Sequence, residues 1–107
     1  MLNFKPVIVE SPYAGDIERN KLYLEQCMRD CLLNHNEAPY ASHKLYTDVL
    51  DDDINNERDV GIQAGFAWGK FAHACIVYVD FGISEGMQLG IDNAKKNGIP
   101  VIMRKLL

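Results

Sequence analysis

The sequence predicts a small α/β domain in which helices cover both faces of a doubly wound parallel sheet. Three observations predict this fold class. Short runs of consecutive apolar residues, typical of strands buried on both faces, alternate with segments of helical periodicity. Gly, Pro, Asn and Asp separate these segments. The length of 107 residues suits one domain with one core.

Residues 1–107 are therefore expected to form a single Rossmann-like or flavodoxin-like domain. Right-handed crossover connections make 2-1-3-4 the simplest order for four parallel strands. In that order the first and third strands are neighbours, and a crevice opens beyond their carboxyl ends. This crevice is where a ligand is expected.

The first half of the chain predicts a strand, a helix, a second strand and a loop. Residues 6–10 form a buried strand that a Ser-Pro turn ends. Asp16 is placed to cap a helix that runs to about residue 33. Residues 38–42 are expected to form a short strand, and residues 43–55 a loop.

A second helix is expected to run to about residue 71 or 73, capped by Asn55 or Asn56. Three glycines recur along it at every fourth residue: Gly61, Gly65 and Gly69. Each glycine costs a helix interior about 0.8–1 kcal/mol relative to alanine, so the stripe predicts a close approach of another element. That element is either another part of this chain or a second subunit, with Phe66 and Trp68 as anchors.

The last third predicts strand, helix and strand. Residues 75–79 are apolar, rich in β-branched and aromatic side chains, and form the clearest strand. Ser84 is placed to cap a helix to about residue 96, which Asn97-Gly98 ends. Residues 100–103 form the final strand.

The turns after the first and third strands are the predicted ligand site. Each contains glycine, offers a serine hydroxyl and opens a helix, whose free amides and dipole favour an anion. Neither turn has the G-x-G-x-x-G or Walker pattern, so the usual NAD and ATP sites are not expected. The candidate ligand-binding residues are Ser11, Pro12, Tyr13, Gly15, Asp16, Asn20, His43, Asp80, Phe81, Gly82, Ser84, Gly86 and Gln88. Tyr13, Tyr46 and Phe81 are the candidates for stacking on a base.

Composition excludes several other classes of function. A net charge of −4 with scattered basic residues argues against a nucleic-acid partner, and no apolar run reaches the ~20 residues of a membrane span. The three histidines share no ligand spacing, and the acidic run at residues 51–53 lacks the EF-hand pattern. No metal or cofactor is therefore expected, and the acidic run predicts a solvated lid. Three cysteines without a paired motif predict buried free thiols and a cytoplasmic protein.

Two segments carry a resemblance to a known family. Ser11-Pro12-Tyr13-Ala14-Gly15-Asp16, followed by Asn20, and Asp80-Phe81-Gly82 through Gly86-Met87-Gln88-Leu89-Gly90 resemble the two ligand loops of the nucleoside 2-deoxyribosyltransferase-like superfamily. That superfamily includes deoxynucleoside monophosphate N-glycosidases and small phage-encoded relatives. The resemblance runs from residue 7 to residue 101. It implies a nucleoside-like ligand, a pocket residue at His43, and a homodimer or higher oligomer whose subunits complete each other's sites.

One residue departs from the family pattern. The enzymes carry Gly-x-Glu-Leu-Gly, whose Glu attacks the anomeric carbon, and the resemblance places Gln88 at that catalytic position. An amide cannot form the glycosyl ester or act as a base near neutral pH. Glu85, one turn earlier, could replace it, or could serve only as a first-turn carboxylate that the helix dipole favours. Asp80 could hold a sugar hydroxyl or orient Ser84.

Three hypotheses about function follow. The leading one is a binder of a nucleotide-derived small molecule without efficient catalysis, and the phage relatives suggest sequestration of a nucleotide signal used in host defence, in the host cytoplasm. The second is an N-glycosidase or deoxyribosyltransferase acting on nucleosides or their monophosphates, with Glu85 or Asp80 in the catalytic role. The third is a module that binds a host protein through the glycine-striped helix.

Overall fold

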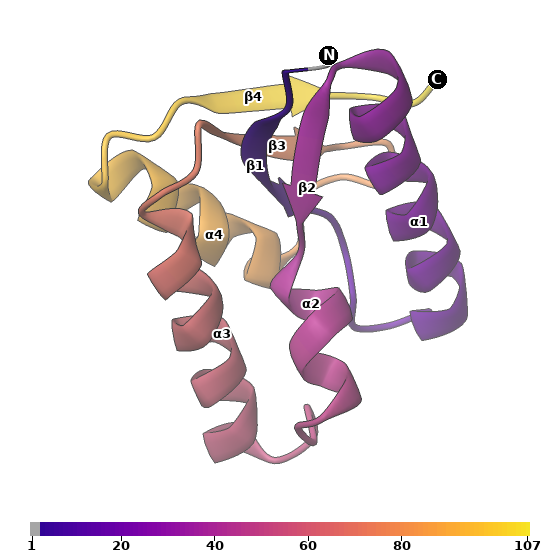
Figure 1. The fold of residues 1–107 in the computed structure, drawn as a ribbon. Coiled ribbons are helices and arrows are strands. Elements are labelled where there is room, and N and C mark those ends of the chain that lie inside the picture. The colour runs from indigo at the N-terminus through magenta and orange to yellow at the C-terminus, as the bar shows by residue number, and fades with distance from the viewer. Residues whose placement is uncertain (1–2) are drawn as a thin grey trace.

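The computed structural model describes residues 3–107 and shows one parallel four-stranded sheet (Figure 1). Its strands lie in the order β2-β1-β3-β4, which confirms the predicted order 2-1-3-4. Ile8 of β1 pairs with Tyr40 of β2 on one side and with Cys75 of β3 on the other. The strands are β1 (Lys5–Glu10), β2 (Glu37–Tyr40), β3 (Ala74–Tyr78) and β4 (Val101–Arg104).

Helices cover both faces of the sheet, as predicted. In Figure 1, α1 lies on one side of the sheet, and α3 and α4 lie together on the other. Between β2 and α3 the chain forms the short helix α2 and a 3-10 turn, η1. The helical elements are α1 (Ile17–Asn34), α2 (Ser42–Leu45), η1 (Tyr46–Asp48), α3 (Asn55–Gly69) and α4 (Glu85–Lys96).

The sheet separates two apolar layers, because successive side chains of a strand point to opposite faces. Val7, Val9 and Ile76 pack under α1 with the buried side chains of that helix. Cys75 and Val77 face the other way and pack with Met87, Ile91 and Ala94 of α4. The cysteines of the chain, Cys27, Cys31 and Cys75, are all free and buried, as predicted.

The predicted caps hold for two helices and are wrong for the third. The Asp16 carboxylate accepts a hydrogen bond from the Arg19 amide (3.2 Å), and the Ser84 hydroxyl accepts one from the Met87 amide (3.2 Å). Neither Asn55 nor Asn56 caps α3. Ile54 occupies the cap position without a side-chain hydrogen bond, and Asn55 is already helical.

The predicted second strand is too long, and the predicted loop after it is partly helical. β2 ends at Tyr40 because the next carbonyl, that of Ala41, accepts the amides of Lys44 (3.1 Å) and Leu45 (3.3 Å). The chain thus turns into α2 at Ser42. This segment carries His43 and Tyr46 toward the carboxyl edge of the sheet.

The glycine stripe of α3 packs within the chain. A Cβ atom on Gly65 would lie 2.7 Å from Cβ of Ser42, and one on Gly61 would lie 3.4 Å from Cδ1 of Leu50. Near the end of α3, a Cβ on Gly69 would lie 3.3 Å from Nδ2 of Asn93 on α4. The predicted close approach is confirmed, with neighbours in the same chain.

Gly65→Ala is expected to lower the free energy of unfolding, because the added methyl group would collide with Ser42 on α2. Overpacking of this kind costs roughly 1–3 kcal/mol, more than the ~0.8–1 kcal/mol that alanine gains in helix propensity. Urea denaturation measures the change. Gly86→Ala is the matched control, since no neighbour lies within 4 Å of its added methyl; equal stability losses in both variants would contradict the explanation.

No helix between residues 3 and 107 combines the length and the apolar character needed to cross a membrane.

Candidate functional site

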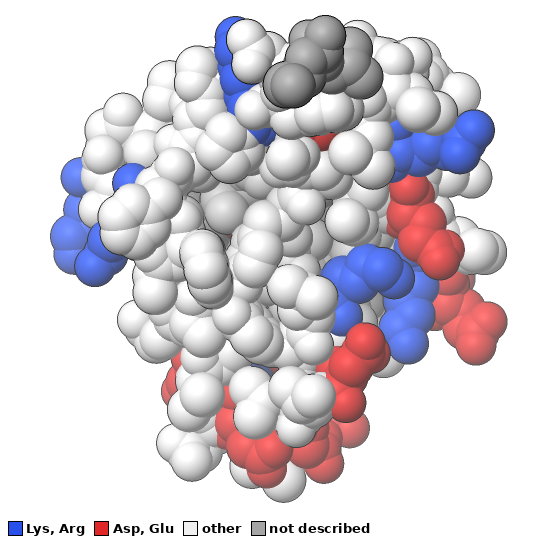
Figure 2. Space-filling view, in the orientation of Figure 1, with Lys and Arg blue, Asp and Glu red and all other residues white. Residues whose placement is uncertain are grey.

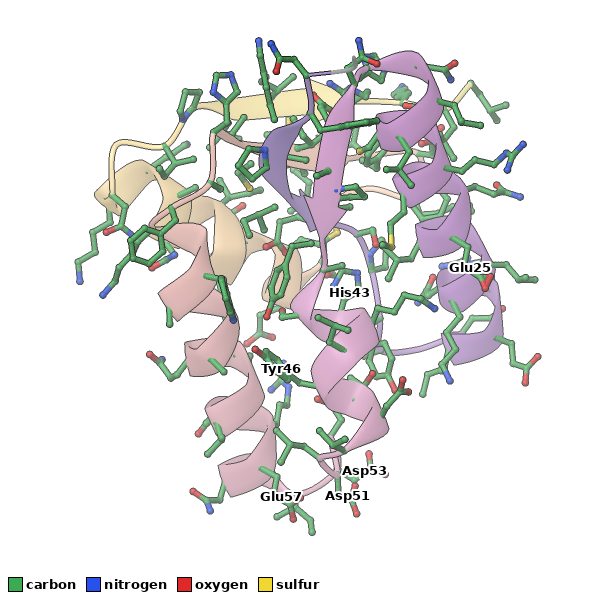
Figure 3. All side chains as sticks on the ribbon, viewed as in Figure 1. Glu25, His43, Tyr46, Asp51, Asp53 and Glu57 are labelled. Carbon is green, nitrogen blue, oxygen red and sulfur yellow. The ribbon has the colours of Figure 1, made fainter. Side chains whose placement is uncertain are left out.

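A pocket of about 250 Å³ opens at the carboxyl edge of the sheet. Its walls come from the end of β1 and the turn after it, from α2 and η1, from the amino-terminal half of α3, and from the start of α4. Figure 3 shows His43 and Tyr46 on the segment that borders this space. The crevice predicted from the strand order is therefore present, and the α2–α3 segment forms an additional wall.

The structure brings residues of both predicted turns to this pocket. Ser11 and Tyr13 line it from the first turn, and Ser84, Glu85 and Gly86 line it from the second. Two further sequence candidates line it from the α2–η1 segment, namely His43 and Tyr46.

Gly15, Asp16 and Asn20 shape the turn after β1 and do not line the pocket. Nδ2 of the buried Asn20 donates to the carbonyls of Tyr13 (3.0 Å) and Ala14 (3.1 Å). Gly15 takes a φ of +93°, which glycine adopts without strain, and Asp16 caps α1. Pro12 is buried beside them and also lies outside the pocket lining.

The candidates at the start of the second turn face away from the pocket. Asp80 accepts hydrogen bonds from the Tyr23 hydroxyl (2.5 Å) and from the Leu106 amide (3.0 Å), so it ties the carboxyl-terminal segment to α1. Phe81 packs on the Tyr23 ring, with a centroid distance of 4.6 Å, and under the Arg19 guanidinium. Gly82 makes the turn itself with a φ of +83°.

Gln88 also lies outside the pocket. Its side chain is exposed and donates from Nε2 to the Asp92 carboxylate on the next turn of α4 (2.9 Å). Met87 and Ile91 occupy the buried face of the helix, so the helical spacing turns Gln88 toward solvent. The geometry therefore gives Gln88 no contact with the space where a ligand would sit.

A Ser-His pair lies inside the pocket. Oγ of Ser11 and Nε2 of His43 are 2.8 Å apart, which joins the end of β1 to α2. Burial lowers the pKa of His43 to about 4, so the imidazole is neutral at neutral pH. A neutral imidazole and a hydroxyl offer hydrogen bonds to a ligand without adding charge.

Glu10 is the main pocket residue that sequence reasoning missed. It ends β1, lines the pocket and is partly buried. Burial raises the pKa of its carboxyl group to about 8. The sequence contains a signal for Glu10, because an acidic residue ends an otherwise apolar strand at the edge of the sheet where ligands of this fold bind.

Charged residues of α3 and the preceding loop complete the wall. Asp52, Glu57 and Arg58 line the pocket, and Arg58 is the only Lys or Arg among its described lining residues. Figure 2 shows acidic side chains gathered at the lower end of the molecule, where Figure 3 labels Asp51, Asp53 and Glu57. Sequence reasoning missed these contacts because they depend on the fold of the segment after β2.

Comparison with solved structures shows a related fold. The chain is similar to a 2-deoxyribosyltransferase from the psychrotolerant bacterium Bacillus psychrosaccharolyticus, with a TM-score of 0.66 and 14% sequence identity. The similarity covers 94% of this chain and 72% of the other. No curated protein matches the sequence. Residues 5–104 match the family described as Domain of unknown function (DUF7768), and the chain therefore belongs to that family.

Proposed function

We propose that the pocket binds a nucleoside or a nucleoside-derived small molecule. The observation that carries this proposal is a pocket at the switch point of a 2-deoxyribosyltransferase-like fold, with both sequence-predicted turns in its walls. Its volume of about 250 Å³ suits a compact ligand.

The lining offers separate groups for the two halves of a nucleoside. Tyr13 and Tyr46 provide aromatic rings on which a base can stack. Hydroxyl and carboxyl groups that can bond a sugar come from Ser11, Ser84 and Glu85. The free amides at the start of α4 can donate hydrogen bonds to one anionic group.

The charge of the pocket favours a ligand with at most one phosphate. Asp52, Glu57 and Glu85 contribute carboxyl groups, against the single guanidinium of Arg58. Because like charges repel in a partly closed site, several phosphates would be poorly accommodated. A nucleoside or nucleoside monophosphate thus fits better than a multiply charged nucleotide signal. If the protein sequesters a defence signal in a phage-infected cell, that signal is expected to carry at most one phosphate.

Tyr46→Ala is expected to weaken nucleoside binding by about 5- to 150-fold, since stacking on an aromatic ring contributes ~1–3 kcal/mol per base. Tyr46→Phe keeps the ring and is expected to keep the affinity. Titration calorimetry against ribonucleosides, deoxynucleosides, their mono- and triphosphates and cyclic ADP-ribose measures both effects.

Phe71→Ala is the control for this experiment, because Phe71 is a highly exposed aromatic outside the pocket. Equal loss of affinity in Phe71→Ala and Tyr46→Ala would contradict the placement of the base. Failure of every compound in the panel to bind would overturn the proposal and favour a protein partner.

A second candidate function is cleavage of the bound nucleoside at its N-glycosidic bond. The position of Glu10, a carboxyl group within the pocket, is the observation that favours it. Recovery of intact ligand after incubation and heat denaturation indicates binding alone, whereas recovery of the free base indicates cleavage.

A further inference from the structure

The charges of the pocket lining restrict the kind of base that the pocket can hold. Three carboxylates line it, those of Asp52, Glu57 and Glu85, against the single guanidinium of Arg58. His43 adds no positive charge, because burial lowers its pKa to about 4. These charged side chains therefore give the lining two more negative than positive charges at neutral pH.

The three carboxylates are not neutralised within the described part of the chain. The two ion pairs found among residues 3–107 involve none of them. Glu57 accepts a hydrogen bond from the Asp51 amide (2.9 Å), which is an uncharged donor. Outside the pocket, the acidic surface in Figure 2 lies at the end of the molecule where Figure 3 labels Glu57. A cleft whose walls carry one sign of charge concentrates ligands of the opposite sign.

A further carboxyl group reaches the pocket from β1. Glu10 is half-buried and lines both the pocket and a smaller cavity of about 50 Å³. Its carboxyl group lies against α4, since a Cβ atom on Gly90 would lie 2.8 Å from Oε1 of Glu10. Glycine at position 90 therefore leaves room for this carboxyl group, which adds an acceptor to the lining and, when ionised, another negative charge.

Two aromatic rings share the pocket with these carboxylates. Tyr13, in the turn after β1, and Tyr46, in η1, are half-buried and line it. The face of an aromatic ring is electrically negative, so a cation within about 6 Å of the ring centroid is attracted to it. Aromatic faces together with carboxylates favour a positively charged ring over a neutral one, because a neutral ring gains only from stacking.

We infer that the pocket selects nucleosides whose base carries a positive charge, such as an N-alkylated purine or an N-ribosyl pyridinium. The inference rests on the proposed nucleoside binding and names the class of base. The cationic ring stacks on Tyr13 or Tyr46, and the carboxylates of the lining balance its charge. The same carboxylates disfavour a base that carries a negative charge.

Titration calorimetry against pairs of nucleosides that differ in charge tests this selection. The first pair is 1-methyladenosine, which is largely protonated at neutral pH, and its neutral isomer N6-methyladenosine. The second pair is N7-methylguanosine and guanosine, compared at slightly acidic pH, where only the methylated base is cationic. In each pair the cationic nucleoside is expected to bind about tenfold more tightly, the combined effect of one cation–π contact and one partly exposed ion pair.

Removal of the pocket carboxylates is expected to remove the preference. The triple variant Asp52→Asn, Glu57→Gln and Glu85→Gln keeps the approximate size of each side chain, and the new amide oxygen at position 57 can still accept the Asp51 amide. The two members of each pair are then expected to bind with affinities within about twofold of each other.

The matched control removes three exposed carboxylates that lie outside the pocket lining. It combines Glu18→Gln and Glu25→Gln on α1, where Figure 3 labels Glu25, with Asp59→Asn on α3. Both triple variants change the net charge from −4 to −1, so they separate the charge of the pocket from that of the whole protein. The control is expected to keep the preference for the cationic nucleoside.

The salt dependence of the unmodified protein tests the same point without a variant. Raising the salt concentration from about 0.1 M to about 1 M shortens the Debye length from ~10 Å to ~3 Å. The preference is therefore expected to shrink as salt is added, because the carboxylates of the lining are only partly buried or exposed.

Equal affinity of the unmodified protein for both members of each pair would overturn this inference and leave the proposed nucleoside binding standing. Absence of binding by every nucleoside would overturn both. A preference for the cationic member that survives in the pocket variant, or that is lost equally in the control, would overturn the assignment of the selection to the pocket carboxylates.

Discussion

Arg104→Leu is expected to lower the free energy of unfolding by roughly 3–5 kcal/mol, the cost of removing one partner from a buried ion pair. Arg104 donates from Nη1 to Oε1 of Glu37 (2.8 Å) and from Nη2 to Oε2 (3.1 Å). The two side chains are only 14% and 11% exposed, so leucine would leave the Glu37 carboxylate without compensation and away from water. Arg104 also donates to the Tyr78 hydroxyl (3.2 Å).

The effect of this substitution is expected to depend on pH. Burial alone would raise the pKa of Glu37, but the hydrogen bonds and charge of Arg104 outweigh burial and hold the pKa below its ordinary value. A carboxyl group whose pKa is depressed on folding stabilises the protein above its unfolded-state pKa, near 4.5, and that stability is lost as the pH falls through the folded-state value. The difference between the two proteins should therefore be largest near neutral pH and shrink in acid.

Urea denaturation at neutral and acidic pH measures this difference. Lys105→Leu, at an exposed neighbouring position, is the control and is expected to change stability little. A loss of stability in Arg104→Leu that is equally large at both pH values would contradict the role of the ion pair. The double variant Glu37→Leu with Arg104→Leu removes both charges and is expected to recover much of the loss.

The sequence predicts the sheet well because its strands are short apolar runs with clear ends. β3 is buried at every position, and such a run is typical of a central parallel strand. Asp16 and Ser84 mark their helices through local hydrogen bonds, which a sequence pattern can reveal. The α2–η1 segment has no comparable signal, although local hydrogen bonds form it, and its place depends in addition on the close approach of Ser42 to Gly65 on α3. Contacts between distant segments are not contained in local patterns.

The candidate site likewise contains some residues that the sequence identifies and others that only the fold brings together. Ser11 and Ser84 could be found because strand order places both turns at one edge of the sheet. The prediction of Gln88 as a site residue rests on its place in a short motif, but a motif does not fix which face of a helix its residues occupy. Met87 and Ile91 are buried, so Gln88 is turned outward and Gly90 inward. The partner of Gly90 is Glu10, eighty residues earlier in the chain, and only the folded structure joins them.

Glu10→Gln is expected to make the protein more stable at alkaline pH than the unmodified chain. In the native state burial raises the pKa of Glu10 from 4.5 to about 8, while in the unfolded chain the group titrates near its ordinary value. Below pH 4.5 both states are protonated, and the group has no effect on stability. Between pH 4.5 and about 8 only the unfolded state releases the proton, so the free energy of unfolding falls as the pH rises.

Glutamine keeps the shape of the protonated acid and cannot ionise, so it removes this dependence. Since one pKa unit corresponds to about 1.4 kcal/mol, the advantage of Glu10→Gln at pH 9 is expected to be on the order of 3–5 kcal/mol, and to vanish near pH 4.5. Urea denaturation from pH 5 to pH 9 measures the difference, with Glu25→Gln as the exposed control. Parallel stability curves for Glu10→Gln and the unmodified protein would mean that Glu10 is ionised in the native state at neutral pH.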